Sequence, residues 1–129
     1  MKKKYHIKHK IDDWNIVIEI DHNFDMSRKP YIDMEDAIQK MVKFWDSWEE
    51  DLYEHCGDYT KVLLYNIAKE SYIETMKNDR SVKNTIASFN IKEGYTPMDG
   101  SYGITILEIN KYIAYDISLF DFELTNDTV

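Results

Sequence analysis

Residues 33–55 read DMEDAIQKMVKFWDSWEEDLYEH, and their hydrophobic spacing decides how the whole chain is interpreted. The apolar residues recur at steps of four and three, which at 100° per residue places them along one side of a helix. Asp33 is a suitable N-cap, and Gly57 follows the segment where a helix often ends in a left-handed turn. The spacing predicts one long amphipathic helix with a buried hydrophobic seam. The seam comprises Met34, Ile38, Met41, Trp45, Trp48 and Leu52.

The opposite side of this predicted helix is acidic. Asp46, Glu50 and Glu54 recur at intervals of four, and Glu49 and Asp51 flank them. Like charges at this spacing cost about 0.2–0.5 kcal/mol per pair, and anions are disfavoured near a helix C-terminus. Helix stability therefore does not explain these acids. We interpret them as a docking face for a basic protein or as a surface that imitates nucleic-acid phosphates, and the alternative is an ordinary solvated surface.

Alternating apolar and polar residues predict strands on both sides of the helical region. Two alternating segments flank Asp12 and Asp13, which indicates an N-terminal β-hairpin. Period-2 segments return near the C-terminus, after a glycine-rich stretch. The predicted strands are residues 5–11, 14–20, 103–110 and 119–125, and residues 112–115 are a further candidate.

Two more helices are expected between the strands. Residues 58–78 carry apolar side chains around much of a helical circumference, and residues 81–89 form a short third helix. The element order predicts an α+β fold: an N-terminal hairpin, two long helices plus a short third, and C-terminal strands. The strands should form an antiparallel sheet with the helices on one face. We expect one domain, residues 1–129.

The charge balance restricts the class of partner. The formal net charge is −8, yet residues 1–10 hold five lysines and no acid, so residues 11–129 contain 11 basic and 24 acidic residues. Such a body repels phosphates, and we expect no direct binding to nucleic acid or to an anionic membrane. A basic protein is the expected partner. The sequence shows no apolar run of membrane-spanning length and no signal-peptide core, which predicts a cytoplasmic protein.

Motifs for catalysis or metal binding are not found. The four histidines lack a ligand spacing, and Cys56 is the only cysteine. The chain contains neither a phosphate-binding GxxxxGK[ST] motif nor a dinucleotide-binding GxGxxG motif. We therefore expect no metal, no cofactor and no catalytic residue. An enzyme that uses the abundant carboxylates remains an alternative.

The stretch from residue 92 to 103, KEGYTPMDGSYG, contains three of the four glycines and is expected to be an ordered surface loop. Its large side chains suit either partner recognition or anchorage of the loop to the body. The candidate binding residues in the loop are Tyr95, Met98, Asp99 and Tyr102. The alternative function is a small enzyme or ligand-binding domain that uses residues 93–103.

The same loop carries a resemblance. Glu93-Gly94-Tyr95, then Pro97-Met98-Asp99-Gly100-Ser101, then Gly103-Ile104, is similar to a pattern in a family of small phage, prophage and bacterial proteins of unknown function. That family also resembles this chain in its lysine-containing opening hairpin and in an aromatic within the first helix, here Phe44-Trp45. The resemblance brings no catalytic residues.

What the resemblance implies is a phage or mobile-element accessory protein that binds and modulates a host component. Together with the charge balance, it leads us to expect a non-enzymatic protein that binds a basic host protein. The contact would use the acidic helix face, the loop, or both. A self-associating structural protein is a third possibility, and the oligomeric state is left open.

Overall fold

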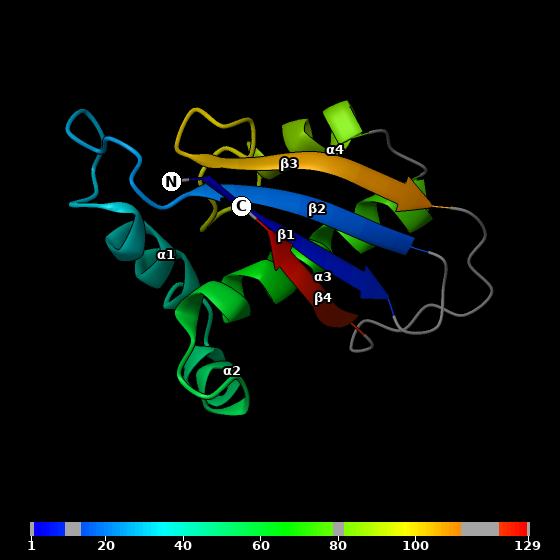
Figure 1. Ribbon diagram of the computed structural model, residues 1–129, viewed down its shortest axis with the longest axis horizontal. Helices are drawn as coiled ribbons and strands as arrows, with labels where there is room; N and C mark the ends of the chain where they lie inside the picture. Colours follow the sequence, from blue (N-terminus) through cyan, green and yellow to red (C-terminus); the bar gives the residue numbers. More distant parts are fainter. Residues whose placement is uncertain (1, 10–13, 79–81, 112–121, 129) are drawn as a thin grey trace.

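The computed structural model describes residues 2–9, 14–78, 82–111 and 122–128 (Figure 1). Its strands form a four-stranded antiparallel sheet in the order β3-β2-β1-β4. The α+β class, the N-terminal hairpin and the C-terminal strands are thereby confirmed. The expected turn at Asp12 and the candidate piece at 112–115 lie outside the described residues. The elements are β1 (Lys2–His9), β2 (Trp14–Asp21), α1 (Met34–Val42), α2 (Trp48–Glu54), α3 (Tyr59–Asn78), α4 (Val82–Phe89), β3 (Ile104–Lys111) and β4 (Phe122–Thr128).

Helices α3 and α4 cover one face of the sheet, and α1 and α2 lie to one side (Figure 1). Helix α3 contacts β1, β2 and β4, and α4 contacts β3. On that face, alternate residues of the two central strands are buried, for example Ile7 on β1 and Ile16 and Ile18 on β2. Each fully buried aliphatic side chain contributes roughly 1.5–3 kcal/mol to stability, so this layer dominates the free energy of folding.

Four of the lysines near the N-terminus, Lys2, Lys3, Lys4 and Lys8, belong to the central strand β1. In the antiparallel register Lys2 lies opposite Asp21, and Lys4 lies opposite Glu19. Opposite charges that face each other across strands contribute roughly 0.2–1 kcal/mol per pair. The basic opening segment is therefore part of the sheet and is not a separate basic arm.

The long helix predicted over 33–55 is wrong, because it is divided into α1 and α2 by an elbow at residues 43–47. In the elbow the amides of Phe44 and Trp45 bond to the carbonyls of Met41 and Val42, three residues back instead of four. The two aromatic rings turn toward the segment that follows α4. The rings of Trp45 and Tyr95 lie 4.9 Å apart, so contacts distant in sequence replace the continuation of the helix.

The hydrophobic seam is correspondingly divided. Met34, Ile38 and Met41 are buried in the core, as predicted. Trp48 and Leu52, together with Trp45, are only half-buried, and none of the residues of α2 is fully buried. The seam is therefore fully buried in α1, whereas Trp48 and Leu52 of α2 pack against the margin of the core with part of their surface exposed.

Candidate functional site

Helix α2 lies at the margin of the molecule, beyond the end of α3 and away from the sheet (Figure 1). It is held between the elbow and a tight turn at residues 55–57. Tyr53 is 87% exposed, although it is a large aromatic residue. We call residues 46–56 the α2 surface, and it contains all five acidic residues predicted for the helical docking face.

The elbow changes the electrostatic meaning of these acids. Glu49, Glu50 and Asp51 occupy the first turn of α2, where the free backbone amides favour anions by about 0.3–1 kcal/mol each. The hydroxyl of Ser47 also donates to Asp51 Oδ2 at 3.0 Å. The sequence argument that these carboxylates burden a helix C-terminus is therefore wrong for these three residues, and only Glu54 lies at the C-terminal end.

Four of the acids remain available to a partner. Asp46, Glu49, Glu50 and Glu54 are exposed. Within the described part of the chain, no ion pair joins any of them to a lysine, arginine or histidine. A basic ligand at this surface would therefore gain attraction without first breaking an internal ion pair.

An open groove of about 770 Å³ accompanies the acids. Its apolar lining comes from Trp48, Leu52 and Tyr53, with Cys56 and Gly57 at its end, and its acidic residues are Glu49 and Glu54. The groove is shallow and wide open to solvent, so it offers a contact surface and not an enclosed pocket. The α2 surface thus combines a hydrophobic wall with a charged edge.

The turn after α2 fixes one end of the groove. The amide of Gly57 donates a hydrogen bond to the carbonyl oxygen of Leu52 at 2.8 Å. The amide of Cys56 donates one to the carbonyl oxygen of Tyr53 at 3.2 Å. This is a Schellman turn. The left-handed position that we predicted for Gly57 begins one residue earlier, because Cys56 has φ = 57° and Gly57 has φ = 81°.

His55 joins this turn to the body of the protein. Its ring stacks on Tyr65 at 4.7 Å with an interplanar angle of 11°. The hydroxyl oxygen of Tyr65 in turn accepts a hydrogen bond from the amide of Leu124 in β4 at 2.9 Å. Burial, reinforced by Lys61, lowers the pKa of His55, so the ring that supports α2 is neutral at neutral pH.

The loop residues predicted for binding fall into two groups. Met98 is 0% exposed and belongs to the core, so its assignment as a partner-contacting residue is corrected. Tyr95 packs between Trp45 and Phe89, with ring centroids 4.9 Å and 4.8 Å away, and burial raises the pKa of its hydroxyl. These two side chains anchor the loop to the body, which is the alternative that the sequence left open.

Asp99 and Tyr102 lie nearer the surface. Asp99 is exposed and accepts a hydrogen bond from the Ser101 amide at 2.9 Å, and the hydrogen bonds from Ser101 lower the pKa of this carboxyl group. Tyr102 is half-buried, with Lys29 Nζ 4.3 Å from the centre of its ring. Both residues take part in internal contacts that stabilise a tight turn next to β3.

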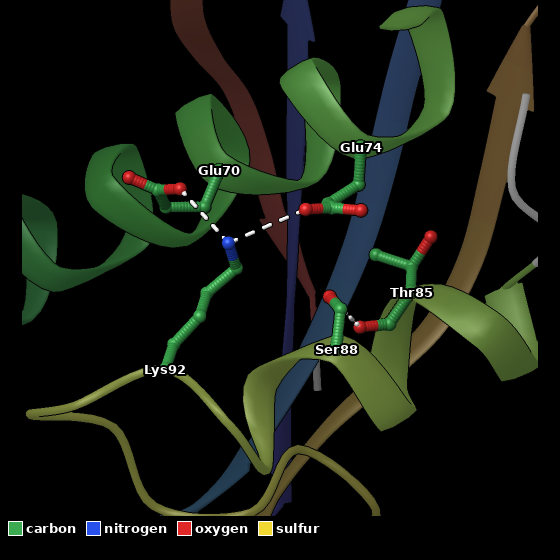
Figure 2. A network of polar contacts seen from close by, with 5 residues as sticks. All are labelled: Glu70, Glu74, Thr85, Ser88 and Lys92. Carbon is green, nitrogen blue, oxygen red and sulfur yellow. Dashed lines mark hydrogen bonds and ion pairs between the residues drawn. The ribbon is translucent and has the colours of Figure 1, made fainter. Parts of the chain in front are cut away.

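A charged contact holds the start of the loop. Lys92 Nζ lies 3.4 Å from Glu70 Oε2 and 3.3 Å from Glu74 Oε1, both on α3, as Figure 2 shows. At the end of α4, the hydroxyl of Ser88 donates to the carbonyl of Thr85 at 2.6 Å. The ion pairs of Lys92 therefore fasten the start of the loop to α3, and the Ser88 bond lies within α4.

Two curated proteins of a phage and a prophage are similar to most of this chain. "Protein ea10" of Escherichia phage lambda and "Lambda prophage-derived protein ea10" of Escherichia coli O6:H1 (strain CFT073) are each 30% identical to this chain over 119 residues. The match covers 88% of this chain and 89% of each relative. The chain belongs to the ea10 family. No family model matches it, and no solved structure matches it.

Membership of the ea10 family confirms the predicted relation to phage and prophage proteins. The names of these relatives state no activity. Among the described residues, no group of three His, Cys, Asp or Glu could hold a metal ion. Within the same residues, no helix is both long enough and apolar enough to cross a bilayer.

This ea10-family protein has a second, more polar cavity of about 350 Å³. Its lining includes His22, Glu35 and Asp58. The hydroxyl of Tyr5 lies 2.7 Å from His22 Nε2. Burial, with a contribution from Lys3, lowers the pKa of His22. No residue of the loop 93–103 lines this cavity, so it does not support the ligand site that we considered for that loop.

Sequence reasoning missed the groove residues Tyr53 and Cys56, which lie off the predicted seam. It also assigned Trp48 and Leu52 to the core. One signal could have revealed the break: Ser47 followed by Glu50 fits the S-x-x-E pattern that marks the start of a helix. A helix that begins at Trp48 places Glu49 and Glu50 in its favourable first turn.

Proposed function

We propose that this ea10-family protein is a non-enzymatic phage accessory protein that binds a basic host protein through the α2 surface. The observation that carries the proposal is the composition of α2. This helix buries none of its residues completely, and it presents an exposed tyrosine and two half-buried residues, Trp48 and Leu52, beside carboxylates that have no ion-pair partner among the described residues. Exposed apolar residues edged by charge are typical of protein-binding surfaces.

The net charge of −8 supports a basic partner. Acidic surfaces attract cationic proteins at long range and raise the association rate, whereas apolar contacts in the groove slow dissociation. The seven residues of α2 span only about 10 Å at 1.5 Å per residue. This length suits a local contact with one basic segment. If that segment normally binds nucleic acid, the complex would block it by charge mimicry.

Site-specific photo-crosslinking in the bacterial host tests the location of the contact. A photoreactive phenylalanine analogue replaces Tyr53, which is 87% exposed, or Ile91, which is 86% exposed but lies outside the α2 surface. We expect a discrete adduct with a basic protein from position 53 and not from position 91. Identical adduct patterns at both positions, or no adduct at position 53, would contradict the proposal.

Charge reversal tests the role of the acids. The variant Glu49→Lys, Glu50→Lys, Glu54→Lys should abolish the adduct formed at position 53. A matched control reverses three exposed acids elsewhere, Glu35, Glu93 and Glu108, and changes the net charge by the same amount. If both triple variants lose the adduct equally, net charge and not the α2 surface determines binding.

The alternative of a small enzyme or ligand-binding domain built on residues 93–103 has less support. Met98 is buried and Tyr95 is packed between aromatic rings. The lowered pKa of Asp99 makes it a poor general acid or base at neutral pH. The loop therefore has the contacts of a structural element.

A further inference from the structure

We infer that the segment bound by the α2 surface is a basic amphipathic helix, whose apolar side fills the groove beside Trp48, Leu52 and Tyr53. This inference rests on the proposed function and goes beyond it, because it names the structural form of the partner and the part of the partner that enters the groove. Neither follows from an acidic surface alone.

The direction of the groove favours a helical partner. Trp48 and Leu52 lie four residues apart on one side of α2, so the apolar wall follows the axis of this helix, and Cys56 lines the groove from the turn after the helix. Its volume of about 770 Å³ is large enough for several side chains. A partner that places apolar residues at similar intervals can fill the wall along its whole length, which is the geometry of helix-in-groove recognition.

The backbone hydrogen bonds of the α2 surface also favour a helical partner over an extended peptide. The backbone amides of His55, Cys56 and Gly57 donate hydrogen bonds to carbonyl groups in the last turn of α2. The wall therefore offers side chains and no edge of unpaired backbone groups. An extended peptide would gain no backbone hydrogen bonds there, in contrast to a peptide that adds to a sheet. A helix satisfies its own backbone and loses nothing by this arrangement.

The charges select a basic helix in preference to a second copy of this chain. Glu49 and Glu54 lie beside the apolar wall. Lysine and arginine can lay their aliphatic stems on apolar surface while their charged ends reach carboxylates. A second copy would bring another acidic α2 against this one, and like charges in an interface are strongly unfavourable.

A designed peptide tests the inference without knowledge of the natural partner. The probe is an 18-residue helix of leucine and lysine with all leucines on one side, labelled with a fluorophore. A permuted peptide of the same composition has its leucines spread around the helix. Fluorescence anisotropy should show the amphipathic peptide binding at least about tenfold more tightly than the permuted one.

Protein variants locate the binding of the probe. Tyr53→Ser should raise the dissociation constant of the amphipathic peptide by about tenfold, because the substitution removes an apolar residue of the groove and leaves the acidic residues in place. Ile91→Ser removes an equally exposed apolar residue elsewhere and should leave binding unchanged. The triple reversal of Glu49, Glu50 and Glu54 should abolish binding, whereas the reversal of Glu35, Glu93 and Glu108 should weaken it far less.

The possible failures of the inference and of the proposed function can be told apart. Equal binding of the two peptides, or no effect of Tyr53→Ser on peptide binding, would overturn the inference that the partner segment is an amphipathic helix. The proposed acidic docking surface would still stand if the photo-crosslinks from position 53 to a basic host protein are observed. Loss of those crosslinks would refute both. Sedimentation of a dimer that Tyr53→Ser dissociates would show that a second copy occupies the groove and would also overturn the inference.

Discussion

Gly94 shows why the Glu93-Gly94-Tyr95 segment has the residues it has. Its φ of 89° lies in the region that favours glycine, and a Cβ at this position would collide with the ring of Phe44. Tyr95, the next residue, packs on Trp45, the neighbour of Phe44. The glycine thus permits the close approach that turns the chain at the elbow. The glycine of the Glu93-Gly94-Tyr95 segment is therefore a requirement of folding.

A double-mutant cycle tests this interpretation. Gly94→Ala should lower the free energy of unfolding by about 2–4 kcal/mol, because it adds backbone strain and a steric collision. Phe44 is 49% exposed, so Phe44→Ala alone should cost about 1 kcal/mol or less. In the double variant the collision disappears and only the strain remains, so its cost should be clearly below the sum. Urea unfolding measures all four proteins; additive costs would disprove the contact.

At the scale of elements, the predictions succeeded where local periodicity and tertiary packing agree. The alternating residues of β2 and the 20 residues of α3 have one consistent interpretation each, and the structure has both. The segment 33–55 does not, because its seam is compatible with one helix or with two. The choice depends on the contact of Trp45 with Tyr95, which lies 50 positions away and leaves no periodic signal.

The candidate site was predictable to a similar extent. The five acids were identified from their spacing, but the energetic reason given for them depended on an unbroken helix. The groove could not be predicted, because the exposure of Trp48 and Leu52 follows from the elbow. Met98 illustrates the opposite error: large residues in glycine-rich loops recognise partners or anchor the loop, and composition does not distinguish these roles.

The attachment of α2 should depend on pH. Burial holds the pKa of His55 below its usual value of 6.5. The unfolded chain therefore binds this proton more readily, and the stability gained from the neutral ring is complete above pH 6.5 and is lost as the pH falls below it. His55→Phe keeps a ring over Tyr65 but cannot titrate, so its free energy of unfolding should fall less steeply between pH 7.5 and 5.

Urea unfolding at several pH values measures this slope in the wild type and in the variant. A residual slope is expected in both proteins, because burial also lowers the pKa of His22. The lowered pKa values of Asp36 and Asp99 make the free energy of unfolding depend on pH near and below their usual value of 3.8, which lies outside the range from pH 7.5 to 5. Identical slopes in the two proteins would show that His55 remains hydrated and does not couple α2 to α3.

At the scale of the whole molecule, the two signs of charge are differently organised. Lysines of β1 lie opposite acids of β2 within the sheet, whereas the acids of the α2 surface have no ion-pair partner among the described residues. Part of the excess negative charge therefore lies unpaired beside the apolar groove. This organisation makes salt act in opposite directions on the free protein and on a complex.

For the free protein, we expect salt to raise the Tm. Self-repulsion within a chain of net charge −8 opposes the compact state, and ions screen it. For the complex with the leucine–lysine peptide, screening removes attraction instead, and the dissociation constant should rise by about tenfold or more between 50 and 500 mM NaCl. Thermal unfolding and anisotropy over the same salt series measure both effects. If the Tm rises while the affinity stays constant, the acids of the α2 surface contribute repulsion to the fold and nothing to recognition.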